Sequence, residues 1–141
     1  MTDRLGLEEA KAIVDAMLAE AARRDLKFAA AVVDAGGDLI HLSRMNGASA
    51  LNARMSHNKA YTATKWQRDT RVLKERLFDM SLGDDRREIS WFGDPRYTPV
   101  WGGIVLRASD GTMLGALGES GGTPELDEEI GRLGEQLFKS L

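Results

Sequence analysis

The chain has 141 residues, 43% of them hydrophobic and 29% charged, so we expect one globular domain with its own core. A net charge of −3 argues against a nucleic-acid-binding protein. With no cysteine and 2 histidines, the chain excludes disulfides and thiolate chemistry, and we expect no metal site built from its side chains alone.

The first half of the chain predicts a helix, a β-hairpin and a second helix. Apolar residues recur with helical spacing from Leu7 to about Arg24. Two apolar runs, Phe28–Val33 and Leu39–Leu42, flank a Gly-Gly turn and predict the hairpin. Small residues recur on one stripe between about Ala48 and Trp66, which predicts a helix lying close against a sheet.

The second half predicts a short helix over RVLKERLFDM, a long loop from Ser81 to Pro99 and a second hairpin. The strands of this hairpin, Gly103–Arg107 and Thr112–Leu117, flank an Asp-Gly turn. Thr123 and Pro124 then begin a last amphipathic helix. This order indicates an α+β fold with helices packed on an antiparallel sheet.

The sequence gives no reason to expect a membrane partner. No stretch approaches the roughly 20 apolar residues that span a bilayer. The first residues are charged throughout, unlike a secretory signal. We therefore expect a cytoplasmic protein.

Several blocks resemble, in order, those of the GlcG/HbpS-like family. They are VVDAGGDLIHLSRMNGA, SHNKAYTA, WGGIVL, DGTMLGALGESGG and ELDEEIGRLG. The resemblance implies a single domain over residues 1–141, a profilin-like antiparallel sheet with helices on both faces, and a homo-oligomer. Family members are associated with haem binding or haem degradation, so haem is the cofactor implied, while others belong to small-molecule catabolism. Glu119 is a departure, since the family usually has an aliphatic residue there.

Two cationic side chains are candidates for binding an anionic ligand. Arg44 ends a predicted strand just before Asn46, Gly47 and the second helix, so its guanidinium and the free N–H groups of the helix can bind a carboxylate or a haem propionate. The alternative is an arginine that covers apolar surface or pairs with an acid. Lys59 has the same two interpretations.

Three further positions are candidates for chemistry. His57 lies on the small stripe and is either a haem ligand or acid-base group, or a structural histidine bonded to a carbonyl. Glu119 is either a general acid or base, or an exposed carboxylate at a strand end. We interpret Ser120, Gly121 and Gly122 as part of a turn whose N–H groups can bind an anion. The GESGG run fits G-x-S-x-G, but no His follows it, so we reject a serine hydrolase.

Aromatic and acidic residues each admit two interpretations. The aromatic residues in and after the long loop either stack on a flat ligand, or pack the loop or fill an oligomer interface: Trp91, Phe92, Tyr97 and Trp101. The family resemblance implies a weak iron site at Glu125 and Glu128, because acidic E-x-x-E pairs are proposed to bind iron in some relatives. Acidic residues also favour the first turn of a helix, so we expect no metal.

The sequence supports three hypotheses of function. The first is a protein that binds a small, anionic ligand, with haem as the cofactor. The alternative is a cofactor-free catabolic enzyme of isomerase, tautomerase or hydratase type, in which Glu119 and His57 transfer protons and Arg44 orients a substrate carboxylate. The third is a non-catalytic interaction module. The first two predict that Arg44, His57 and Glu119 line one cavity.

Overall fold

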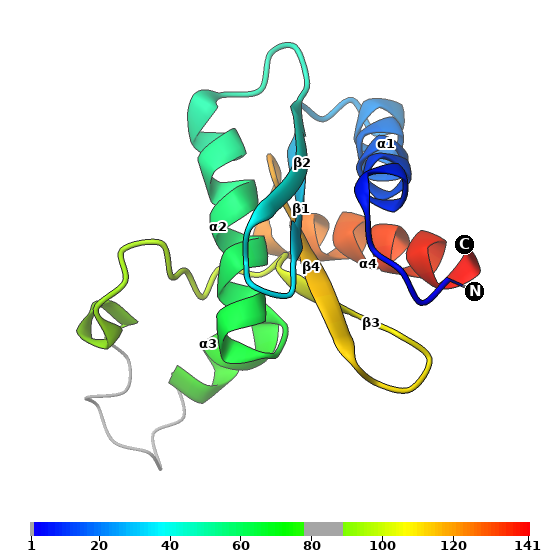
Figure 1. Ribbon diagram of the computed structural model, residues 1–141. Coiled ribbons are helices and arrows are strands. Elements are labelled where there is room, and N and C mark those ends of the chain that lie inside the picture. Colours follow the sequence, from blue (N-terminus) through cyan, green and yellow to red (C-terminus); the bar gives the residue numbers. More distant parts are fainter. Residues whose placement is uncertain (1, 78–88) are drawn as a thin grey trace.

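The computed structural model describes residues 2–77 and 89–141 of a chain that folds around one antiparallel sheet (Figure 1). Its elements in chain order are α1 (Leu7–Arg23), β1 (Ala29–Asp34), β2 (Leu39–Arg44), α2 (Ala50–Trp66), α3 (Thr70–Leu77), the 3-10 helix η3 (Ile89–Phe92), β3 (Ile104–Arg107), β4 (Met113–Ser120) and α4 (Pro124–Ser140).

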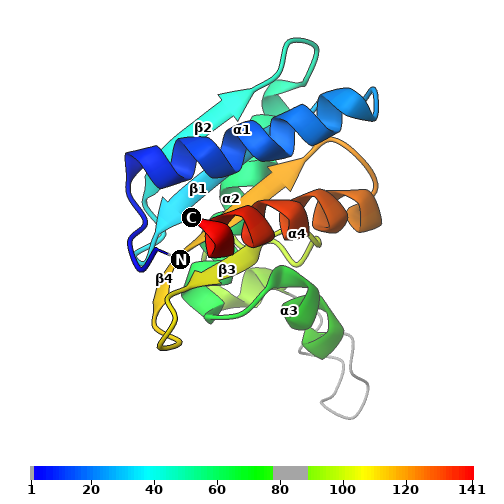
Figure 2. The ribbon, with the colours of Figure 1, turned by 90° about the vertical axis from the view of Figure 1, so that its right-hand side faces the viewer.

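The sheet has the strand order β2-β1-β4-β3, and all three strand pairs are antiparallel. Helices α1 and α4 lie side by side across one face, and α2 covers the other face (Figure 2). The predicted α+β architecture, with an antiparallel sheet and helices on both faces, is therefore confirmed.

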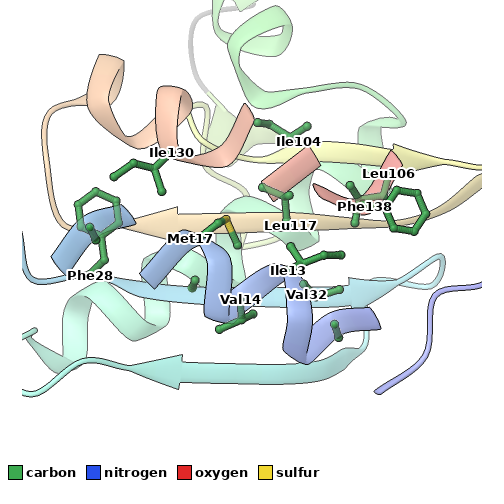
Figure 3. Close-up of a cluster of buried hydrophobic side chains, with 13 residues drawn as sticks. Ile13, Val14, Met17, Phe28, Val32, Ile104, Leu106, Leu117, Ile130 and Phe138 are labelled. Carbon is green, nitrogen blue, oxygen red and sulfur yellow. The ribbon is translucent and has the colours of Figure 1, made fainter. Parts of the chain in front are cut away.

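The larger core fills the space between the sheet and the pair α1 and α4 (Figure 3). Ile13 and Met17 of α1, Leu117 of β4, and Ile130 and Phe138 of α4 are completely buried there. These side chains have the periodicity that the sequence shows, because one stripe of each amphipathic helix must be removed from water.

On the other face of the sheet, the backbone of α2 lies very close to the backbone of β4. A Cβ built on Gly118 would lie 2.2 Å from the carbonyl oxygen of Ser56 and 2.7 Å from the amide nitrogen of Ala60. Only glycine allows the helix backbone to approach the strand this closely. The small residues of α2 and the glycine of β4 therefore set the position of the helix.

The structure differs from the predicted elements at β4 and α2. Strand β4 continues past Leu117 to Ser120, because β1 still pairs with it where β3 has ended. Helix α2 begins at Ala50, since Ser49 caps it by accepting a hydrogen bond from the Asn52 amide at 3.1 Å.

The predicted third helix and long loop are described only in part. Residues 78–80 of the helix and residues 81–88 of the loop lie outside the described residues. Within the remainder of that loop, η3 is a helical turn that the sequence did not predict. None of the helices described is long and apolar enough to cross a membrane.

Candidate functional site

Arg44 lies at the end of β2, on the side of the sheet that α2 covers. It pairs with Ala29, which also pairs with Ser120, and the Ser120 hydroxyl donates a hydrogen bond to Oδ1 of Asn52 in α2 at 3.3 Å. The Arg44 side chain is exposed and has no hydrogen bond or ion pair with residues 2–77 or 89–141. Its guanidinium is therefore free to bind an anion.

The turn after Arg44 adds a second cation to this end of the molecule. Asn46 and Gly47 are exposed, and Gly47 has the left-handed backbone that glycine favours, with φ +89°. The aliphatic stem of Lys27 lies against this glycine, because a Cβ built there would be 3.4 Å from Lys27 Cδ. The turn therefore carries positive charge just before α2 begins.

His57 is half-buried at the edge of α2, beside the β1–β2 turn. Burial lowers the pKa of its imidazole, and the nearby Arg96 lowers it further. A backbone hydrogen bond with Gly37 and the charge of Asp38 act in the opposite direction. The imidazole is therefore neutral near pH 7 and can offer a ring nitrogen to a metal or accept a proton.

A network of charged and aromatic groups next to His57 was not predicted from the sequence. The Tyr61 hydroxyl donates a hydrogen bond to Asp94, and Arg96 donates to the same hydroxyl. Burial and the Asp94 carboxylate raise the pKa of Tyr61 to about 12, while Arg96 and Tyr61 hold the pKa of Asp94 at about 2. The network fixes the loop after η3 to α2, and a contact between residues this far apart leaves no local pattern in the sequence.

The aromatic residues of that loop pack against α2. Phe92 and Tyr97 lie with their ring centroids 4.7 and 5.8 Å from the ring of Trp66. Trp101 is half-buried, and the Arg71 guanidinium lies 4.6 Å from its ring centroid. Phe92 and Tyr97 therefore pack the loop against α2, which is one of the two interpretations given for these residues. The side chain of Trp91 lies outside the described part of the chain.

Lys59 is buried and crosses from α2 to α4 beside Gly102, just before β3 begins. Its ammonium donates to the backbone carbonyl of Glu119 at 2.8 Å and to Oδ2 of Asp127 at 2.7 Å, and 1% of its side chain is exposed. The other carboxylate oxygen of Asp127 accepts from the Gly122 amide at 2.9 Å. Lys59 thus forms a structural ion pair and does not reach outward to a ligand.

The Glu119 carboxyl is fully buried beneath α4. Neither oxygen has a hydrogen-bond partner among the described residues, and Cβ atoms built on Gly102 and Gly131 would lie 2.5 and 2.8 Å from these oxygens. Burial raises the pKa of Glu119 well above its usual value, and the charge of Lys59 only partly opposes this. Burial in the core therefore favours the neutral form of this carboxyl.

The structure does not bring the three predicted residues around one cavity. Arg44 pairs with Ala29, whereas Glu119 pairs with Ala30, and successive residues of a strand point to opposite faces. Arg44 and His57 therefore lie on the α2 side and Glu119 on the α4 side. The expected proton-transfer pair of Glu119 and His57 is not assembled, because the sheet lies between Glu119 and helix α2, which carries His57.

The structure also differs from the prediction at the glycine-rich turn and at the acidic pair of α4. Ser120 belongs to β4, so only Gly121 and Gly122 remain as a turn where the sequence predicted a longer anion-binding loop. Of the acidic pair, Glu125 is exposed, whereas Glu128 is buried and forms ion pairs with Arg71 and Arg132. No cluster of three or more residues suited to hold a metal ion occurs within residues 2–77 and 89–141.

Comparison with known families decides the relationship. The family model described as haem degrading protein HbpS-like matches residues 5–135. This chain belongs to the HbpS-like family. The resemblance seen in the sequence blocks is thereby confirmed.

Relatives of this HbpS-like protein agree with the fold. Protein GlcG of Escherichia coli is 31% identical over 116 residues, which are 82% of this chain and 81% of GlcG. A double mutant of HbpS from Streptomyces reticuli superposes with a TM-score of 0.82 and 25% identity, over 97% of this chain and 88% of that one. The PduOC:haem complex superposes with a TM-score of 0.83 and 22% identity, over 94% of each chain.

Proposed function

We propose that this HbpS-like protein binds haem, with His57 as the iron ligand. Membership of a family described as haem degrading supports the proposal, and so does the likeness to PduOC, which is known as a haem complex. The observation that carries it is the neutral, half-buried imidazole of His57 at the edge of α2.

The chemistry of His57 fits that of a haem-iron ligand. Histidine binds haem iron through a neutral ring nitrogen, and a hydrogen bond from the other nitrogen to a carbonyl commonly orients such a ligand. His57 combines a lowered pKa with a position beside the backbone of Gly37, whose effect opposes that lowering. When bound, haem supplies the iron centre and a flat apolar ring.

The propionates of haem need cationic partners, and Arg44, with the Asn46–Gly47 turn, is the proposed one. Arg44 is on the same side of the sheet as His57, near the beginning of α2. His57 follows the first residue of α2 by seven positions, which is about 10 Å along a helix axis. The free guanidinium of Arg44 can form charge-assisted hydrogen bonds with a carboxylate.

The test is titration of the full chain with hemin, followed by the Soret band. We expect a saturable shift in the wild type, loss of the shift in His57→Ala, and retention in the matched variant His41→Ala. His41 Nε2 is 3.0 Å from Ser43 Oγ, so it is already hydrogen-bonded. Loss of the shift in His41→Ala but not in His57→Ala would overturn the assignment of the ligand, and a wild type without any shift would overturn haem binding.

The contribution of Arg44 is tested by the same titration. We expect Arg44→Gln to weaken hemin binding about two- to five-fold, the effect of one exposed charge pair. Arg76→Gln, at an exposed arginine of α3 away from the proposed haem site, is the control and leaves the affinity unchanged. A homo-oligomer and a cytoplasmic location remain proposals, and sedimentation equilibrium measures the first.

A further inference from the structure

A second candidate site lies at the other end of α2, between α3, the edge strand β3 and the last turns of α4 (Figure 2). It is an open pocket of about 310 Å³. Its walls include three cationic side chains, those of Arg68, Arg107 and Lys139. The pocket shares no residue with the proposed haem site, so the failure of one proposal leaves the other intact.

The two acidic residues of the pocket already have partners. Asp69 accepts a hydrogen bond from the Val105 amide at 2.9 Å through one oxygen and from Arg132 at 2.8 Å through the other. Glu135 forms ion pairs with Arg132 at 3.1 Å and with Lys139 at 3.8 Å. Both carboxylates therefore have cationic partners within the fold, with Arg132 bridging the two.

Two arginines of the pocket have no such compensation. Arg107 donates to the backbone carbonyls of Gly111 and Gln67 at 3.1 and 3.3 Å, and these acceptors carry no net charge. The Arg68 side chain has neither a hydrogen bond nor an ion pair with any residue of 2–77 or 89–141. Two guanidinium groups therefore line one pocket, and neither has a carboxylate partner within residues 2–77 and 89–141.

The wall between these charges is apolar. Val105 is buried in β3, whereas Val72 of α3 is 41% exposed. A ligand that places its charge on the arginines and an apolar chain over Val72 would remove this surface from water. Bound water or a simple inorganic anion cannot provide that second contact.

We propose that this pocket binds a small carboxylate that carries a short apolar chain. Its carboxylate accepts hydrogen bonds from Arg68 and Arg107, because guanidinium groups match carboxylates in charge and geometry. Its apolar chain packs against Val72 and Val105.

The experiment is a titration of the 15N-labelled full chain with hexanoate at constant ionic strength, followed by amide chemical shifts. We expect saturable shifts of the Val72, Val105 and Arg107 amides. Acetate and inorganic phosphate, which lack the apolar chain, bind at least about three-fold more weakly. Equal affinity for all three anions would show that charge alone acts, and would overturn the proposal. Shifts that do not saturate would also overturn it.

Variants separate binding from folding. Arg68→Gln removes a side chain without hydrogen bonds in the described structure, so the fold is retained, and we expect the dissociation constant for hexanoate to rise about three- to ten-fold. Val72→Thr, which places a hydroxyl on the exposed wall, weakens hexanoate but not acetate. Arg54→Gln is the control at an exposed arginine outside the pocket. An unchanged affinity in Arg68→Gln would overturn the assigned site.

Discussion

The buried carboxyl of Glu119 makes a specific prediction about how stability depends on pH. Replacement by glutamine keeps the size of the side chain and removes the ionisation. In the folded wild type the carboxyl keeps its proton to higher pH, because burial raises its pKa well above the usual value of about 4.5. In the unfolded chain the same group ionises near that value, since water surrounds it.

The sign of the effect follows from this difference. As pH rises above about 4.5, the unfolded state loses a proton that the folded state retains, so the free energy of unfolding of the wild type falls. One such group contributes at most about 1.4 kcal/mol per pH unit. This contribution stops growing once the pH passes the folded-state pKa of Glu119. Glu119→Gln lacks the contribution altogether.

The assay is urea denaturation, followed by circular dichroism between pH 5 and 8 at one protein concentration. We expect the stability difference, Glu119→Gln minus wild type, to increase with pH. Glu125→Gln, which removes an exposed carboxylate of α4, is the matched control for the loss of one carboxylate. A Glu119→Gln difference that does not vary with pH would show that Glu119 ionises alike in both states, and would refute the reasoning.

Three further substitutions probe the contacts that hold the layers together. Lys59→Met leaves the carboxylate of Asp127 buried without its cation, so we expect a loss of about 3–5 kcal/mol in urea denaturation. Gly118→Ala forces a methyl group against the Ser56 carbonyl, with a built Cβ only 2.2 Å away, and should cost about 1–3 kcal/mol in the same assay. Tyr61→Phe removes the hydroxyl that joins the loop after η3 to α2, so it should cost about 1 kcal/mol and speed hydrogen exchange of that loop.

Matched variants test the reasons given for the first two losses. Lys139→Met removes an exposed lysine of α4, and Gly36→Ala adds a methyl group where the nearest atom is 3.3 Å away in a side chain. Each control should change stability by less than about 1 kcal/mol. If Lys59→Met or Gly118→Ala costs no more than its control, the buried ion pair or the close backbone contact is not what stabilises the fold. For Tyr61→Phe, unchanged exchange in the loop would contradict the role of the hydroxyl.

The elements that the sequence predicted well are those with strong periodicity and clear end signals. Helix α4 has Thr123 and Pro124 at its beginning and a continuous apolar stripe, and it forms where expected. The Gly-Gly and Asp-Gly turns likewise position both hairpins. Local pattern was sufficient here because each element buries one face against the same sheet.

The site was predicted less well, because its contacts depend on which strands remain paired. From the sequence, we predicted that the last strand ends at Leu117 and that Glu119 lies beyond it, at the strand end where the turn begins. Strand β1 keeps β4 paired further, so Glu119 follows the alternation of Leu117 and points into the same core. The alternation of inward and outward residues along a strand, continued from Leu117 to Glu119, could have predicted this burial. No local signal indicates that Lys59 reaches Asp127, 68 residues away in the chain.

The crossing of Lys59 also constrains how the molecule assembles. An ammonium that belongs to α2 has its carboxylate partner only in α4, on the opposite layer. A nascent chain that lacks its last helix must leave that ammonium in water or bury it alone, so α2 cannot dock fully at that stage. The two layers should therefore become native in one cooperative event, late in synthesis, rather than one after the other.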